Sequence, residues 1–135
     1  MAEPKLATSA RPLSPHLQIY KWGPHMLVSI LHRATGDALA LGGAPILLWW
    51  LYSISAGAEA YANFIAVATS VPGIIVLVAI TFALFEHMAS GIRHFVLDIG
   101  AGYELVTNRN WAIMVPVIAG LSTAMLWLSI AFRNL

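Results

Sequence analysis

Three long stretches without charged residues constrain this chain more than any other feature of its sequence. No Lys, Arg, Asp or Glu occurs between Asp37 and Glu59, between Glu59 and Glu86, or between Arg109 and Arg133. Each stretch reaches the roughly 20 residues that an α-helix needs to cross a hydrocarbon core of about 30 Å. We therefore predict an all-α membrane protein with three transmembrane helices.

The composition agrees with this class and excludes several others. Of the 135 residues, 59% are hydrophobic and 10% are charged, whereas soluble domains carry roughly 25% charged residues. A net charge of +1 gives no sign of a nucleic-acid partner. The chain has no cysteine, which excludes disulfides, thiolate ligation of an iron–sulfur cluster and thiol catalysis.

The chain divides into an N-terminal arm and a membrane domain. Residues 1–25 contain four prolines, which argue against a continuous helix, and we expect this arm to lie on the cytoplasmic side and at the interface. Residues 26–135 form the predicted transmembrane domain, with helices at about 26–55, 62–98 and 111–132.

The basic residues predict the orientation of the three helices. All but one lie on the side of the N-terminus: Lys5, Arg11, Lys21, Arg33, Arg93 and Arg109, with Arg133 on the other side. Because positive charge stays on the cytoplasmic side, the N-terminus is expected in the cytoplasm. We expect the inner (cytoplasmic) membrane of a bacterium, ahead of the mitochondrial inner membrane.

Ionisable residues inside membrane helices are costly and mark functional sites. In the first helix Ser29, His32 and Arg33 follow the spacing i, i+3, i+4 and share one face. Arg33 alone is also explained by a side chain that reaches back to the lipid headgroups, and Asp37 is spaced to pair with it. Small residues at Gly36, Ala40 and Gly43 indicate a close helix contact, either within the chain or with a partner.

The second helix carries a histidine near the middle of the membrane. His87 precedes Asp98 by eleven residues, about 16 Å along a helix, and shares a face with Gly91 and His94. A neutral imidazole at this depth is either a packing residue or a metal ligand. We favour His87 as an axial ligand of a b-type haem, with Gly91 giving room for the macrocycle.

One chain then supplies one axial ligand at the depth of the iron. His32 and Arg33 lie several ångströms nearer the cytoplasm, where the haem propionates would point. A six-coordinate haem would need a second histidine from another subunit, so we expect part of a heteromeric helix bundle. The rival interpretation is a self-contained b-type cytochrome with both His32 and His87 on the iron, and the difference in depth argues against it.

The same region suits a quinone. Ser29 and Arg33 are hydrogen-bond donors near the interface, beside the apolar Ile30 and Trp22. On composition alone, Trp22 is better explained as an interfacial anchor.

Two stretches resemble the succinate dehydrogenase cytochrome b556 subunit family. The first comprises the segment 11–17 (RPLSPHL), Pro24 and the segment 29–36 (SILHRATG), and the second is the segment 87–100 (HMASGIRHFVLDIG). The residues of these stretches and the spacings between them both match the pattern of the family. Leu97 departs from the family pattern, which has an aromatic residue or Met there, and Glu86 and Asp37 are acids where uncharged residues are expected.

The resemblance implies a four-subunit complex. A flavoprotein subunit oxidises succinate, an iron–sulfur subunit passes the electrons on, and two membrane anchor subunits hold one haem b and a ubiquinone. By motif position, His87 is the axial ligand of the haem iron, and the second anchor subunit supplies the other. His32 and Arg33 match the propionate side. Ser29 and Arg33 match the quinone pocket, walled by Leu17, Trp22 and Ile30, and no residue of this chain is catalytic.

The predicted function is therefore the membrane anchor of succinate dehydrogenase, which passes electrons from the iron–sulfur subunit to ubiquinone. Two further alternatives are an anchor of a quinol:fumarate reductase and a membrane adaptor without redox function.

Overall fold

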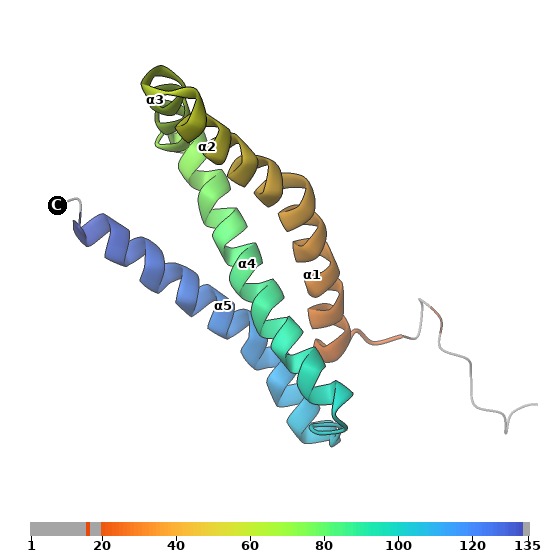
Figure 1. Ribbon diagram of the computed structural model, residues 1–135. Coiled ribbons are helices and arrows are strands. Elements are labelled where there is room, and N and C mark those ends of the chain that lie inside the picture. The colour runs from red at the N-terminus through yellow and green to blue at the C-terminus, as the bar shows by residue number, and fades with distance from the viewer. Residues whose placement is uncertain (1–15, 17–19, 134–135) are drawn as a thin grey trace, which may run out of the picture.

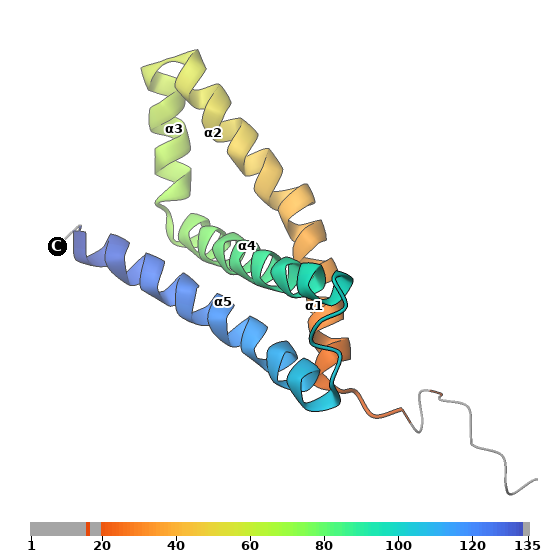
Figure 2. The same cartoon turned by 60° about the horizontal axis from the view of Figure 1, so that its bottom comes forward.

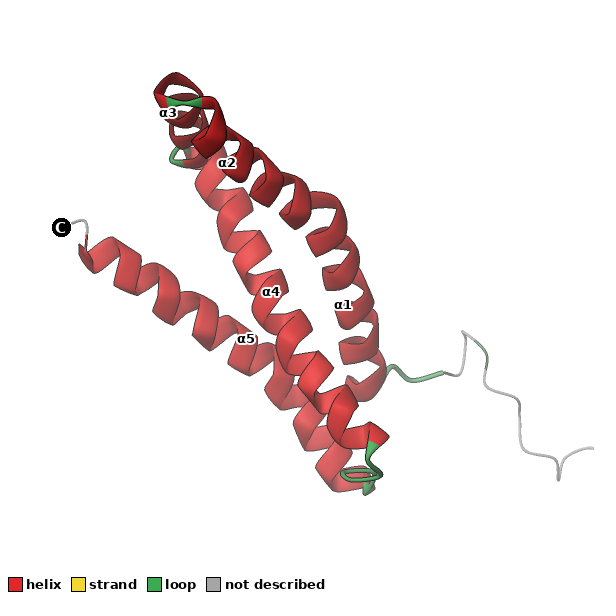
Figure 3. Cartoon of the chain, viewed as in Figure 1, coloured by secondary structure: helices red, strands yellow, loops and turns green. Residues whose placement is uncertain are grey.

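The computed structural model describes residue 16 and residues 20–133, and throughout these residues the regular structure is helical (Figures 1 and 3). The elements in chain order are α1 (Pro24–Ala38), the π-helical turn η2 (Leu39–Gly43), α2 (Ala44–Ala56), α3 (Ala58–Ala68), α4 (Val71–Asp98) and α5 (Leu105–Arg133).

Within the described residues, three helical stretches are long and apolar enough to cross a membrane: Pro24–Ala56, Val71–Asp98 and Leu105–Arg133. The shortest has 28 residues, about 42 Å at 1.5 Å per residue, which exceeds a hydrocarbon core of about 30 Å. The start of α1, the end of α4 and the start of α5 lie at one end of the molecule (Figure 1). The predicted fold class, an all-α membrane protein with three spans, is confirmed.

The first span changes from α-helix to a π-helical turn just before Pro45. The backbone N–H of Ala44 bonds to the carbonyl of Leu39, five residues back, and α2 begins with Pro45 in its first turn. Proline has no N–H and its ring collides with the carbonyl four residues earlier. The wider turn η2 accommodates that collision without interrupting the span.

The second span differs from the expected helix 62–98, because the structure divides this stretch into α3 and α4. Ser70 caps α4, and its hydroxyl accepts a hydrogen bond from the N–H of Gly73 at 3.2 Å. Pro72 in the first turn favours a helix start. A Cβ on Gly73 would lie 2.0 Å from the carbonyl oxygen of Val67, so glycine is needed for this sharp turn.

The three spans pack mainly at the end that contains the start of α1. The buried core there joins Val28, Ala112 and Val115, with Ala89 packed against them. Farther along, α2 leans away and contacts neither α4 nor α5, and α3 bridges it to α4 (Figure 2). Large apolar side chains such as Leu41 and Leu105 are exposed, as expected of helices that face lipid or other subunits.

Candidate functional site

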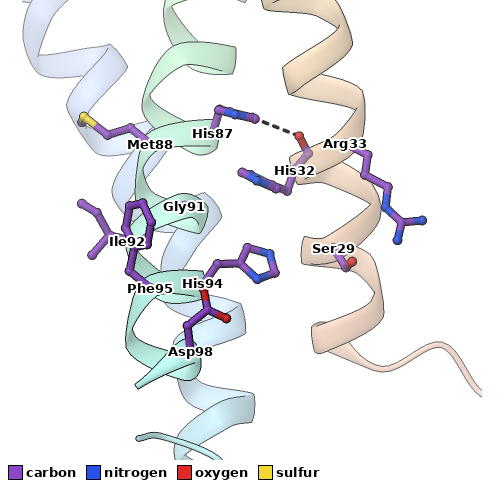
Figure 4. A pocket seen from close by; sticks show the side chains of 10 residues that line it. All are labelled: Ser29, His32, Arg33, His87, Met88, Gly91, Ile92, His94, Phe95 and Asp98. Atoms are coloured by element: carbon purple, nitrogen blue, oxygen red, sulfur yellow. Dashed lines mark hydrogen bonds between the residues drawn. The ribbon is translucent and has the colours of Figure 1, made fainter. Parts of the chain in front are cut away.

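A cavity of about 740 Å³ lies between α1 and α4, near the end where the spans meet (Figure 4). Its volume falls in the range typical of ligand pockets, about 300–1,000 Å³. The lining residues are Ser29, His32, Arg33, His87, Met88, Gly91, Ile92, His94, Phe95 and Asp98. The structure thus brings together the polar faces that helical spacing predicted for two separate helices.

The imidazole rings of His32 and His87 are in contact. Their centroids are 4.0 Å apart, and their planes are inclined by only 12°. The ring of His94 lies 5.1 Å from that of His32, tilted by 45°. The two rings are therefore close enough to touch, although the expected helix bounds differ, because α1 begins earlier than expected and the helices are inclined to one another (Figure 1). The expected difference in depth between His32 and His87 stays a prediction.

His87 is held through its Nδ1 atom. This nitrogen lies 3.1 Å from the backbone carbonyl oxygen of His32, as the dashed line in Figure 4 shows. A carbonyl oxygen only accepts hydrogen bonds, so this contact favours the imidazole with its proton on Nδ1. In the neutral ring the lone pair is then on Nε2, and metal-binding histidines use this same arrangement.

Thr35 and Glu86 lie beside this contact. The hydroxyl oxygen of Thr35 is 2.9 Å from Oε2 of Glu86 and 3.0 Å from the carbonyl oxygen of His32. Glu86 is fully buried at 0% exposure. Glu86 stood out in the sequence as an unexpected acid, and the structure joins it to α1 through Thr35. Thr35 itself was not singled out, although it lies one turn after His32 on the same helix.

Two of the three small residues at helical spacing pack within the chain. A Cβ on Gly36 would lie 3.0 Å from Cε1 of His87, and one on Gly43 would lie 3.6 Å from Ile80. Ala40 is exposed. For Gly36 and Gly43 the alternative of a contact within the chain is the one observed. Gly91 lines the cavity, and a Cβ there would lie 4.0 Å from the ring of His32.

The residues predicted to bind a quinone do not all line the same cavity. Ser29 is half-buried in the cavity, whereas the exposed Arg33 extends away from α4 toward the start of α1 (Figure 4). Among the described residues no ion pair joins Arg33 to Asp37. Trp22 lines a different cavity, of about 420 Å³ between α1 and α5. Ile30 is exposed on α1, and Leu17 lies outside the described residues.

A second polar contact ties α4 to α5. The buried guanidinium of Arg93 donates a hydrogen bond to Oδ1 of Asn108. It lies on a different face of α4 from His87, so it belongs to the helix packing and not to the cavity.

Three apolar spans define a multi-pass helical membrane protein. An open cavity lined in part by histidines lies between its first two spans. The family model for the succinate dehydrogenase/fumarate reductase transmembrane subunit matches residues 7–130. The chain belongs to this family.

Several relatives are similar in sequence to this chain over most of their lengths. The succinate dehydrogenase cytochrome b556 subunit of Rickettsia felis is 40% identical over 119 residues, 87% of this chain and 90% of the relative. The subunit of the same name from Paracoccus denitrificans is 39% identical over 95 residues, covering 70% and 72%. The mitochondrial cytochrome b560 subunit of Mus musculus is 35% identical over 121 residues, covering 88% and 71%. The resemblance seen in the two motifs is confirmed, and the names support a cytochrome b membrane subunit of succinate dehydrogenase.

Proposed function

We propose that this chain is a membrane anchor of a succinate:ubiquinone oxidoreductase, in which it holds a haem b together with a second anchor subunit and binds ubiquinone. The observation that carries the haem assignment is the contact between Nδ1 of His87 and the carbonyl of His32, at 3.1 Å. It leaves Nε2 free to donate its lone pair to iron. The relatives' names, which describe cytochromes b, support the same assignment.

The residues of the cavity fit this cofactor. A haem presents a flat apolar ring and two anionic propionates. Met88, Ile92 and Phe95 give the cavity apolar walls, and Ser29, Arg33 and His94 are polar groups toward the start of α1. Nδ1 of His32 is buried and has no hydrogen-bond partner in the part of the chain that the structure describes, so it suits a polar group of the bound haem. When bound, haem b supplies a site that takes up and releases one electron.

The second axial ligand is assigned to the partner anchor. An iron held by both histidines of this chain would need a ring nitrogen of each directed toward it. His32 and His87 instead present their faces to each other at a centroid distance of 4.0 Å, which leaves no room for a metal between them. This geometry argues against a self-contained cytochrome with both His32 and His87 on the iron.

Ubiquinone is assigned to the rim of the cavity. Ser29 and Arg33 both line it nearer the start of α1 than His87 does, and both donate hydrogen bonds that would hold and polarise quinone carbonyls. Ile30 follows Ser29 directly and Trp22 precedes it by seven residues. Together with Leu17 they form the proposed apolar wall. Trp22 lines the other cavity, so in this wall we assign it only the part nearest the membrane surface.

The N-terminus is assigned to the cytoplasm. Lys21, Arg33 and Arg109 lie toward the end of the molecule that holds the site, and Arg133 lies at the other. The positive-inside rule then places the site on the cytoplasmic side, where the iron–sulfur and flavoprotein subunits of a bacterial complex would dock.

Purification through a tag on this chain tests the proposal. We expect a flavoprotein, an iron–sulfur protein and a second small membrane protein to accompany it, together with a b-type band in the dithionite-reduced minus oxidised spectrum. A band missing from the intact membranes as well as from the purified complex would contradict the proposal and favour an adaptor without redox function.

A further inference from the structure

We propose that Gly36 and Thr35 are positioning residues that set the orientation of the His87 imidazole, and through it the electronic properties of the haem. This inference rests on the proposed function, since it takes His87 as the iron ligand. It assigns roles to a glycine and a threonine that do not themselves touch the iron.

Gly36 leaves the space in which the His87 ring lies. A Cβ at this position would stand 3.0 Å from Cε1 and 3.4 Å from Nδ1 of His87. The first distance is well inside the ordinary contact distance between carbon atoms, about 3.5–4.0 Å. Any side chain at position 36 would therefore push the ring away from α1, and the ring would turn away from the carbonyl of His32.

Thr35 lies between that carbonyl and α4, where its one hydroxyl hydrogen has three oxygen atoms within reach. Its hydroxyl oxygen lies 2.8 Å from the carbonyl oxygen of Leu31, 3.0 Å from that of His32 and 2.9 Å from Oε2 of Glu86. It is also 3.5 Å from Nδ1 of His87. One buried hydroxyl thus joins α1 to the residue that immediately precedes His87 on α4. Without it, the fully buried Glu86 would lose the one hydrogen-bond partner that it has among the described residues.

The consequence for the haem follows from the hydrogen bond at Nδ1. A histidine that donates this bond becomes a stronger electron donor at Nε2, which favours oxidised iron and lowers the midpoint potential. Displacement of the ring weakens the bond. We therefore expect changes at Gly36 or Thr35 to raise the midpoint potential of the haem and to shift the electron paramagnetic resonance signal of its oxidised form.

The test compares five variants of the purified complex. Gly36→Ala is matched by Gly120→Ala, because a Cβ at Gly120 meets nothing within 4 Å. Thr35→Val is matched by Thr123→Val, because Thr123 is also buried but, within the described residues, bonds only to the carbonyl of Ala119 in its own helix. Thr35→Ser keeps the hydroxyl and should restore the wild-type signal and potential.

We expect the shifted signal and raised potential, or loss of haem, in Gly36→Ala and Thr35→Val and not in their controls. Should Gly36→Ala fail to assemble, the comparison of Thr35→Val with Thr35→Ser decides the matter alone. Wild-type signal and potential in both Gly36→Ala and Thr35→Val would overturn this inference and leave the proposed function intact. A wild-type complex without haem b would overturn the proposed function as well.

Discussion

The rings of His32 and His87 lie stacked, with centroids 4.0 Å apart and planes inclined by 12°, yet the hydrogen bond of His87 goes to the backbone carbonyl of His32 and not to its ring. The two histidines therefore have separable roles. The His32 ring can be removed without removing the acceptor that orients His87.

The variant His32→Ala separates the two roles. We expect it to keep the position of the b-type absorption band, because axial ligation through His87 survives. Haem content per complex should fall roughly twofold to tenfold, since one hydrogen bond is worth about 0.5–1.5 kcal/mol. The measurement is the pyridine haemochrome content together with the visible spectrum. A change to a high-spin spectrum would show that His32 is itself an axial ligand, as in a self-contained cytochrome.

The variants Ser29→Ala and Arg33→Ala address the quinone. We expect the rate of ubiquinone reduction to fall by about tenfold or more for Arg33, because hydrogen bonds to charged groups are worth about 1.5–3 kcal/mol, and by less for Ser29. Succinate oxidation with an artificial acceptor that bypasses the quinone should be unchanged.

The matched control for Ser29→Ala is Ser55→Ala, since Ser55 is exposed at the far end of α2 and its hydroxyl bonds to the carbonyl of Tyr52 in its own helix. Unchanged ubiquinone reduction in both site variants would remove Ser29 and Arg33 from the quinone site. Equal losses in both assays would show that their role is in assembly.

The variant Asn108→Ala tests the contact between α4 and α5. Asn108 accepts a hydrogen bond from the buried Arg93, and its loss should cost about 1 kcal/mol of stability. We expect a lower thermal unfolding temperature of the complex with an unchanged haem spectrum. Asn110 is exposed on the same helix, so Asn110→Ala is the control. Equal unfolding temperatures for the two variants would contradict a stabilising role for this pair.

The absence of native cysteine allows a direct test of orientation. Glu59→Cys places a thiol near the junction of α2 and α3, and Tyr103→Cys places one in the loop before α5. With the N-terminus in the cytoplasm, a membrane-impermeant maleimide should label Cys at position 59 in intact cells. Labelling at position 103 should require permeabilised cells, and the reverse pattern would contradict the proposed orientation.

The sequence predicted the three spans because gaps between charged residues report directly on what a membrane core tolerates. It did not predict the break before α4. Pro72 alone is compatible with a continuous membrane helix, and the break depends on the cap by Ser70 and the close approach of Gly73 to Val67.

The site was predicted one helix at a time. Spacing of three, four and seven residues placed Ser29 with His32, and His87 with His94, on single faces. The contact of Thr35 with Glu86 and that of His87 with the carbonyl of His32 cross between α1 and α4. These contacts depend on how far one helix is shifted along the other. The spacing of residues within a single helix gives no information about that shift.

The variant His87→Ala tests whether His87 is the haem ligand of this chain. The measurement is the dithionite-reduced minus oxidised spectrum of the purified complex, recorded beside the control His25→Ala, which changes a histidine of α1 that does not line the cavity. We predict that the b-type band disappears in His87→Ala while the other subunits still copurify and succinate is still oxidised with an artificial acceptor. An unchanged band per complex in His87→Ala would contradict the assignment.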